Sequence, residues 1–452
     1  MSIPLSFNQE FLCMFDQGDE EGPFGPRYNI VGGWRLYGKI DTDALQEALD
    51  DVVVRHEGLR TSIVRSPDGQ RQDIRPPGPV SLEIRELPLP DADGRDRRAE
   101  ELIIEVEGGL YGVTQLPLLR AVLGRFDEQD AVLVLTAHHT AADEISMQLI
   151  MRDLAARYAL RSGRPAPALP EPAQFQEFAV WERERFAPDT PAAVKARAYW
   201  REKLAGGQIT GIPTDHPKSA GLPKTTAVHR FLIDAELTTA TLELARSTRS
   251  TAFMVLLSAY QLLLRERTGV SDVTVPTMVS GRGPARFQDT VGAFFNFVPL
   301  RTGIADCATF REVIERTRAT CFKAYANELP FGQMVAEAPE VAASFAADDL
   351  GVFAFQVFQF AAAQREPAGN LEYSEIRSRV LSQPVSTDIP DGAMIQLAVD
   401  PTTGEMAGYL GYNTNIYRDE TMRRLAEDFR DQLREAVGAP DAPLRSAGPR
   451  AA

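Results

Sequence analysis

The sequence predicts an α+β protein built from two domains of one type. Its 452 residues exceed the size of one ordinary core and suit two domains. Both parts of the chain alternate apolar runs typical of strands with amphipathic stretches typical of helices. Between them, residues 161–172 read RSGRPAPALPEP, a composition that favours a stiff, extended connector. We therefore place the domains at residues 1–172 and 173–452.

The first part is expected to contain two helices and two hairpins before a pair of histidines. Leu45, Leu49 and Val52 recur at helical spacing. Ser66-Pro67-Asp68-Gly69 has proline and glycine where a turn favours them. The expected elements are a strand ending at 34–38, a helix from about 43 to 56, a hairpin of 61–65 and 70–75, a helix over 95–106, and a hairpin of 118–126 and 132–137.

The second part repeats this mixed rhythm without a short sequence repeat. Pro191 stands at the first turn of an expected helix, where a missing N–H costs nothing. Helices are expected at 191–204, 238–246, 252–267, 310–328 and 421–437. Strands are expected at 228–233, 272–279, 294–301, 352–360, 393–399 and 408–413.

Composition excludes several classes of protein. A net charge of −15 argues against binding to a nucleic-acid backbone, which needs a clustered basic face. The longest strongly apolar stretch, 253–264, is too short to span a bilayer, and the N-terminus does not resemble a signal peptide. Three scattered cysteines predict neither a zinc site nor a disulfide framework, and they fit a reducing, cytoplasmic setting. No membrane or nucleic-acid partner is expected.

The stretch 131–146, AVLVLTAHHTAADEIS, carries the chemistry. Its apolar run predicts a strand buried on both faces, and its later residues predict an amphipathic helix. The loop between them holds His138 and His139, and histidine can exchange protons near neutrality. The alternative to a catalytic role is a structural one, with one histidine in the core and the other on the surface. Asp143 could likewise serve only as the N-cap of the helix. A metal site lacks a nearby third ligand, and a serine hydrolase lacks the G-x-S-x-G elbow.

Residues 138–143 match the first six positions of HHxxxDG, the signature of the condensation domains of nonribosomal peptide synthetases. Other motifs of that family occur in order along the chain. The segments of this chain that resemble these motifs, with each family motif in parentheses, are Ser6–Gln9 (SxAQ), Arg55–Thr61 (RHExLRT), Phe175–Trp181 (YxDFAxW), Ser280–Arg282 (the GR turn), Val291–Asn296 (VGxFVN), Leu329–Phe331 (PFE) and Phe355–Val357 (FQV). The chain thus resembles a condensation domain from about residue 4 to residue 437.

The resemblance implies a fold and a site. Condensation domains consist of two subdomains like chloramphenicol acetyltransferase, set in a V with a tunnel between them. Carried onto this chain, the catalytic set is His138, His139 and Asp143, in which His139 is the catalytic histidine and His138 supports the loop. Asp143 is expected to pair with Arg282 as a structural partner. Candidates for lining the substrate tunnel are Glu144, Ser146, Asn296 and Gln356.

Glu144 departs from the family, which has glycine at the end of HHxxxDG. A carboxylate at a helix N-terminus is electrostatically favourable, so simple capping explains it. The alternative is a contact with the amine or hydroxyl of a substrate.

The implied function joins an acyl or aminoacyl thioester on a carrier protein to an amine or hydroxyl in natural-product biosynthesis. No cofactor or metal bound by the chain itself is expected, because the phosphopantetheine arm comes with the carrier. Since the motifs nearly fill the chain, we expect a free-standing enzyme that recruits a peptidyl carrier protein in trans. The acceptor is a small amine or alcohol, or a second carrier protein. The alternatives are a carrier- or CoA-dependent O-acyltransferase of the same superfamily and a non-catalytic recruitment module.

Overall fold

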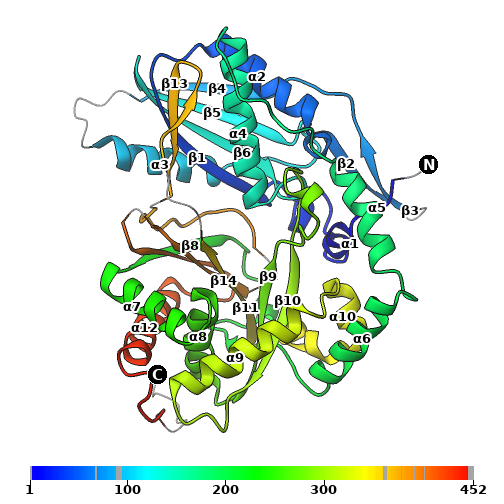
Figure 1. Cartoon of the computed structure of the whole chain (residues 1–452), viewed down its shortest axis with the longest axis vertical. Coiled ribbons are helices and arrows are strands. Elements are labelled where there is room, and N and C mark those ends of the chain that lie inside the picture. The colour runs from blue at the N-terminus through cyan, green and yellow to red at the C-terminus, as the bar shows by residue number, and fades with distance from the viewer. Residues whose placement is uncertain are drawn as a thin grey trace.

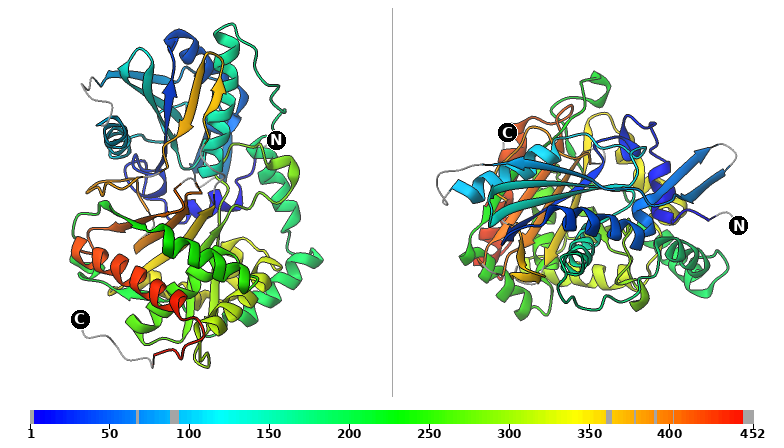
Figure 2. Two further views of the ribbon diagram at one scale, coloured as in Figure 1. Left: turned by 60° about the vertical axis from the view of Figure 1, so that its left-hand side comes forward. Right: turned by 90° about the horizontal axis from the view of Figure 1, so that it is seen from above.

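The structure is a computed structural model that describes residues 3–66, 69–87, 94–359, 364–377, 379–389, 392–401 and 403–445. It contains two large sheets, one in each half of the molecule (Figure 1). Each sheet carries its own helices, so the α+β fold with two subdomains predicted from the sequence is the observed fold. Figure 2 shows the two sheets from two other sides.

The first sheet has six strands. Their order is β12 (Glu366–Ala368), β13 (Leu371–Glu375), β1 (Asn29–Tyr37), β6 (Asp130–His138), β5 (Leu119–Asp127) and β4 (Ser81–Glu86). Helices α2 (Thr42–Arg55) and α4 (Glu144–Arg161) pack into a core on one face, whereas α3 (Arg95–Glu107) packs against the other. This cover on both faces explains why β6 is an almost unbroken apolar run.

The second sheet has seven strands. Their order is β10 (Asn296–Gly303), β9 (Asp272–Val279), β11 (Leu350–Gln359), β14 (Gly392–Val399), β15 (Met406–Asn413) and β8 (Thr226–Ile233), with β7 (Gly211–Pro213) beside β11. Its core is covered on one side by α7 (Ala235–Ser247), α8 (Ala252–Thr268), α9 (Phe310–Tyr325) and α12 (Asp419–Gly438). Side chains on the other side of the sheet point towards the first subdomain, as the lining of the central cavity shows below.

The remaining elements are short or connect the two halves. They are α1 (Phe7–Cys13), α5 (Phe175–Arg185), α6 (Pro191–Leu204), α10 (Phe331–Glu337), α11 (Ala343–Ala346), the hairpin β2 (Thr61–Ser66) and β3 (Gly69–Ile74), and 3-10 turns at Gly22–Phe24, Glu57–Arg60, Lys218–Ala220, Ala285–Phe287 and Pro339–Ala342.

One segment crosses between the subdomains. Strands β12 and β13 lie within the range predicted as the second domain, yet β13 pairs with β1 of the first sheet, with Trp34 opposite Glu375. The boundary at residue 172 remains a prediction, and a single cut in the chain does not separate the two sheets. These strands escaped sequence analysis because they have three and five residues, and because β13 pairs with a strand some 340 positions away.

Most predicted elements are present within a few residues of their predicted ends, including the hairpin of β2 and β3. The turn residues Pro67 and Asp68, and Phe360 at the end of an expected strand, lie outside the described residues. The sequence analysis did not predict β4 or β7. β4 is an edge strand that is mostly exposed, and β7 has only three residues, so neither has a clear apolar pattern.

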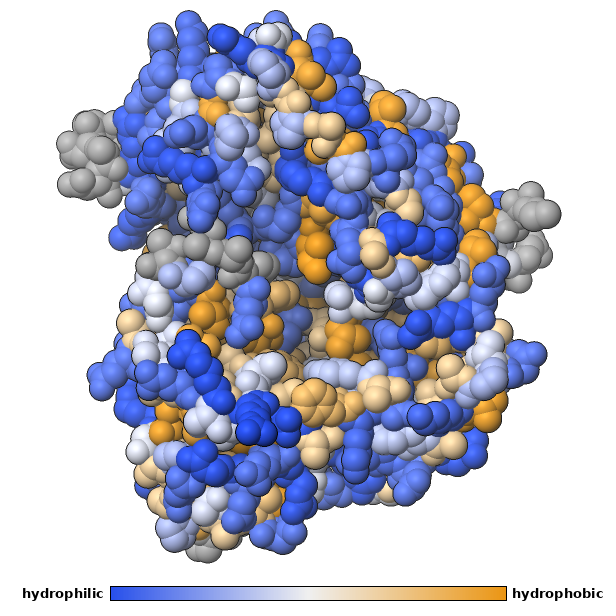
Figure 3. All heavy atoms as spheres, viewed as in Figure 1, coloured by the Kyte–Doolittle hydropathy of each residue, from blue (hydrophilic) through white to orange (hydrophobic). Residues whose placement is uncertain are grey.

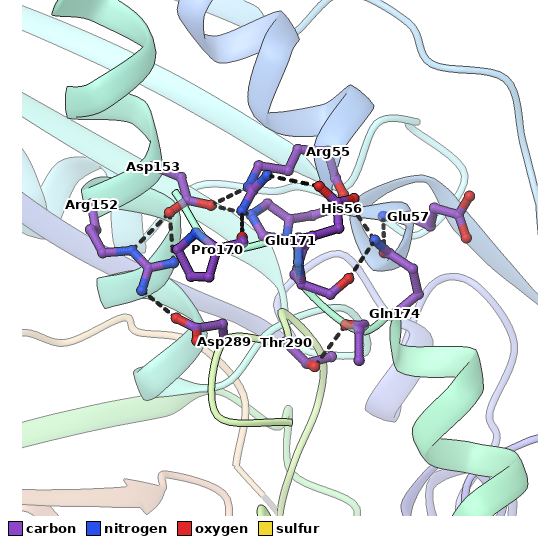
Figure 4. A network of polar contacts seen from close by, with 12 residues as sticks. Arg55, His56, Glu57, Arg152, Asp153, Pro170, Glu171, Gln174, Asp289 and Thr290 are labelled. Atoms are coloured by element: carbon purple, nitrogen blue, oxygen red, sulfur yellow. Dashed lines mark hydrogen bonds and ion pairs between the residues drawn. The ribbon is translucent and has the colours of Figure 1, made fainter. Parts of the chain in front are cut away.

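A polar network around Asp153 fixes α4 to both halves (Figure 4). The buried carboxylate accepts hydrogen bonds from Arg55 Nε at 2.7 Å, His56 Nε2 at 2.8 Å and Arg152 Nε at 2.8 Å. Burial opposes its ionisation, but the bonds from His56, Arg55 and Arg152 prevail and lower the pKa of Asp153 to about 2. Arg152 also pairs with Asp289. The arginine and histidine of the RHExLRT-like motif therefore have a structural role.

Within the described ranges, no helix has the length and apolar composition needed to cross a membrane. Cys13, Cys307 and Cys321 are free. No group of three or more histidine, cysteine, aspartate or glutamate side chains in the described part of the chain lies close enough together to hold a metal ion.

Candidate active site

The site is a loop between β6 and α4, together with the cavity beside it. β6 ends at His138 and α4 begins at Glu144, so residues 139–143 form the loop. The backbone N–H of His139 donates to the carbonyl of Tyr28 at 2.9 Å, which anchors the loop to the start of β1. A buried strand and an N-capped helix thus hold the two histidines from either side.

His138 points into the protein and is fully buried. Its Nε2 lies 3.1 Å from the carbonyl of Gly25, which can only accept, so Nε2 carries the proton. Its Nδ1 then accepts from the Thr140 hydroxyl at 2.8 Å. Burial lowers the pKa of His138 to about 3, so the ring is neutral and structural. This matches the supporting role that the resemblance implied.

His139 points the other way and lines the cavity. Its Nδ1 lies 2.8 Å from the carbonyl of Ala142, so Nδ1 carries the proton and Nε2 keeps a lone pair. The ring stacks on Tyr28 at 5.0 Å and meets Phe295 edge-on at 5.7 Å. Burial lowers the pKa of His139 below its usual value, against the opposing effects of the Ala142 carbonyl and Asp143. The arrangement provides a fixed, neutral base.

Asp143 joins the two halves of the molecule. Its Oδ1 caps α4 by accepting from Ser146 N at 2.7 Å, and it also accepts from Arg282 Nη2 at 2.6 Å. Both predictions for Asp143, a helix cap and a partner of Arg282, are therefore correct at once. Arg282 Nη1 donates to the carbonyl of Thr290 at 2.6 Å, and its guanidinium lies 4.0 Å from the Phe294 ring centroid.

Ser146 does not line the tunnel, which corrects the sequence-based prediction. Its side chain is fully buried, with its hydroxyl 2.6 Å from Asp143 Oδ1 and 2.9 Å from Arg282 Nη2. It also accepts from Gly292 N at 3.0 Å. The first turn of α4 directs this side chain towards the ion pair rather than towards the cavity, so Ser146 stabilises the junction between the halves.

The main cavity has a volume of about 370 Å³ and lies between the subdomains, where the tunnel was expected. Tyr28, His139 and Glu144 line it from the first half, while Gln356 and Tyr409 line it from the second. Figure 3 shows the surface hollowed between the two lobes, with hydrophobic side chains gathered along the hollow. Glu144 and Gln356 therefore lie where the sequence analysis placed them.

Asn296 lies outside the lining of the main cavity. Its side chain bridges two backbone groups, donating to the Leu329 carbonyl and accepting from Phe331 N, both at 2.8 Å. It borders a second cavity of about 40 Å³ that shares Ser280, Phe294 and Phe295 with the first. The tunnel prediction for Asn296 is thus corrected: its half-buried amide has both ends satisfied and forms a structural bridge at the second cavity.

Glu144 faces a second carboxylate. Burial, Glu375 and Asp143 together raise its pKa to about 7, against a smaller lowering by Gln148 and Arg377. Glu375 comes from β13, accepts from Gln148 Nε2 at 2.6 Å and pairs with Arg377. The sequence analysis could not find Glu375 or Tyr28, because neither lies in a family motif. It quoted Phe295 within the VGxFVN-like motif but did not predict that this ring contacts His139.

The sequence matches the family profile of the condensation domain over residues 1–448. This chain belongs to the condensation-domain family. Condensation domains are acyltransferase-type enzymes of nonribosomal peptide biosynthesis that work with carrier proteins and form amide bonds. The motif residues described above thus lie in the context that the resemblance implied.

This condensation domain is 53% identical to the SgcC5 protein from Streptomyces globisporus, with a TM-score of 0.94, covering 98% of this chain and 100% of that one. It is 32% identical to chondramide synthase cmdD of Chondromyces crocatus over 97% of this chain but 11% of the synthase. It is 34% identical to a probable non-canonical nonribosomal peptide synthetase, CymA, of Salinispora arenicola, over 98% of this chain and 6% of that protein. The chain thus spans only a small part of these synthetases.

Proposed function

We propose that this condensation domain transfers an acyl or aminoacyl group from a carrier-bound thioester to a hydroxyl of a small acceptor, forming an ester. The observation that carries the proposal is the orientation of His139. Its Nδ1 is committed to the Ala142 carbonyl, which leaves the basic Nε2 on a ring that lines the cavity.

The proposed reaction needs no cofactor bound by the chain itself. Nε2 of His139 accepts the hydroxyl proton while the oxygen attacks the thioester carbonyl and forms the new C–O bond. The tetrahedral adduct collapses, the C–S bond breaks, and the imidazolium returns the proton to the departing thiolate. The products are an ester and the free thiol of the phosphopantetheine arm. Holding both reactants in the cavity removes an entropic barrier of up to about 7–11 kcal/mol.

Two observations support an aryl alcohol as acceptor. The SgcC5 protein was crystallised with (R)-(-)-1-(2-naphthyl)-1,2-ethanediol, an aryl diol. In this chain Tyr28, Phe295 and Phe297 line the cavity, and the first two contact His139. Aromatic walls favour an aryl group by stacking and edge contacts. An alcohol also needs a general base more than an amine does.

We propose further that the carrier is a peptidyl carrier protein supplied in trans. The family supports a carrier-bound donor, since condensation domains work with carrier proteins. The test mixes the purified protein with an acyl-loaded carrier and 1-(2-naphthyl)-1,2-ethanediol, and follows products by mass spectrometry. We expect the ester, and we expect His139→Ala to reduce its formation by about 10²–10⁴-fold. His216→Ala, a histidine outside the cavity lining, is the matched control and should retain activity.

The same mixture separates the alternatives. Product from the amino analogue of the diol, but none from the diol, would contradict ester formation and favour an amide. Turnover only with acyl-CoA would favour the wider O-acyltransferase superfamily. Carrier binding without any turnover would favour a recruitment module.

A further inference from the structure

One row of side chains crosses the second sheet along the floor of the main cavity. Register places Arg230 opposite Tyr409, Tyr409 opposite Gln396, and Gln396 beside Gln356. The parallel pairing of Phe355 with Thr277 brings Gln356 beside Met278, which is opposite Phe297. The six residues of this row, all lining the cavity, are Arg230, Tyr409, Gln396, Gln356, Met278 and Phe297.

The row changes in character along its length. Its apolar end lies near His139, because Phe295 contacts both His139 and Phe297, at 5.7 and 5.9 Å between ring centroids. Two glutamines follow, and the far end is cationic. Five strand spacings of about 4.8 Å place Arg230 roughly 24 Å from the apolar end. A substrate that reaches both His139 and Arg230 is therefore elongated.

Arg230 is buried with incomplete hydrogen bonding. Its side chain is only 7% exposed, and within the described ranges neither Nε nor Nη2 has a hydrogen-bond partner. Its nearest carboxylate oxygen, on Glu107, is 3.8 Å from Nη2, beyond hydrogen-bond distance. The guanidinium lies 5.3 Å from the centroid of the Tyr409 ring, within the range of a cation–π contact. A buried guanidinium left with unpaired donors is costly.

Glu107 is already committed to other groups. It accepts from Arg379 Nη2 at 2.7 Å and from the hydroxyl of Ser386, both on the segment that crosses between the halves. Arg379 is therefore the structural partner of Glu107, and Arg230 is the second cation beside one carboxylate. Glu100 adds a more distant negative charge and accepts from Leu381 N at 2.7 Å.

We propose that Arg230 binds an anionic oxygen group, a phosphate or a carboxylate, carried by a substrate in the main cavity. Guanidinium groups pair with such groups through charge-assisted hydrogen bonds. Two sources fit an elongated substrate: the phosphate of a phosphopantetheine arm whose thioester reaches His139, or a carboxylate on the acceptor. The inference rests on the proposed function only in taking this cavity as the substrate site.

The proposed role of Arg230 is tested by measuring the binding of two pairs of probes, without any turnover. The first pair is 4′-phosphopantetheine and pantetheine, which differ by one phosphate. The second is 1-(2-naphthyl)-1,2-ethanediol and the same diol with a carboxylate on the distal ring. Calorimetry should show that the wild-type protein binds the charged member of one pair at least about tenfold more tightly than the uncharged member. The pair that shows this difference identifies the source of the anionic group, the phosphopantetheine arm or the acceptor. Equal affinities within both pairs would overturn the proposal.

Variants assign the preference to Arg230. Arg230→Gln should abolish the preference for the charged probe. Arg97→Gln, the same change on a side chain that is 75% exposed, should leave this preference intact. Glu107→Gln should tighten binding of the charged probe severalfold, because it removes the nearest competing carboxylate. Should Arg230→Gln fail to fold, Glu107→Gln decides: unchanged or weaker anion binding would refute the subsite. Since no product is measured, these results are independent of whether ester formation is confirmed.

Discussion

Arg282 Nη2 lies 2.6 Å from Asp143 Oδ1, although the two residues are 139 positions apart in the chain. Their side chains are 2% and 10% exposed, so the pair is screened little by water. It connects the loop that holds His139 in the first subdomain to a turn after β9 in the second. The geometry of the site therefore depends on the contact between the two halves.

Breaking this pair on one side should destabilise the protein strongly. Asp143→Asn keeps an oxygen for the helix cap but leaves Arg282 buried without a counter-charge, at a cost of about 3–5 kcal/mol in the free energy of unfolding. Arg282→Met should cost a similar amount, and the double variant less than the sum of the two. Chemical denaturation measures all three. As a control, the exposed pair Arg434–Asp234 should contribute less than about 1 kcal/mol. Additive costs at Asp143 and Arg282 would show that the pair is not coupled.

Substitution of His138 should mainly lower the stability of the protein, whereas substitution of His139 should mainly lower its activity. His138→Ala leaves the Gly25 carbonyl and the Thr140 hydroxyl without their partner in the core, which costs about 1–3 kcal/mol for each unsatisfied group. His139→Ala removes a partly exposed ring with one such bond and should change the melting temperature much less. Paired melting and product assays check this. A His139→Ala variant that is the less stable of the two would contradict the assignment.

The pH dependence of activity should reflect the lowered pKa of His139. Because burial disfavours the imidazolium, the neutral base persists below the usual histidine value of 6.5. We expect kcat/KM to stay level from neutrality to pH 6.5 and to fall only at lower pH. Glu144 titrates near 7, so the profile is measured in wild type and in Glu144→Gln. The acid limb should survive in the variant; its loss would assign that limb to Glu144 rather than to His139.

Glu144 should make the protein less stable as pH rises. Its pKa is raised from 4.5 to about 7, so the folded state holds the proton more tightly than the unfolded state. The ionised carboxylate therefore costs nothing below pH 4.5, an increasing amount between pH 4.5 and 7, and a constant amount above. Glu144→Gln lacks this cost. Its melting temperature should be close to wild type at pH 4.5 and higher than wild type at pH 8.

Glu375→Gln gives an independent check on the same carboxylate. Removal of this neighbour lowers the pKa of Glu144, so the gain from Glu144→Gln at pH 8 should shrink when both changes are combined. A gain that does not depend on pH would point to packing instead of charge.

Features that depend on the local order of residues could be predicted from the amino-acid sequence. Apolar periodicity located the strands and helices near the histidines, and the order of the motifs indicated the family and the pairing of Asp143 with Arg282. These signals succeed because helix and strand periods, caps and motif spacings are short-range properties of a chain.

Features that depend on residues distant in the chain could not be predicted and are seen only in the folded structure. The paths of β12 and β13 into the first sheet, the burial of Ser146, and the facing of Glu144 by Glu375 all join segments far apart in sequence. The row that ends at Arg230 takes one residue from each of six strands, and strand order and register set which residues become neighbours. Burial and neighbouring charge, which set the pKa values of the site, exist only once these segments pack together.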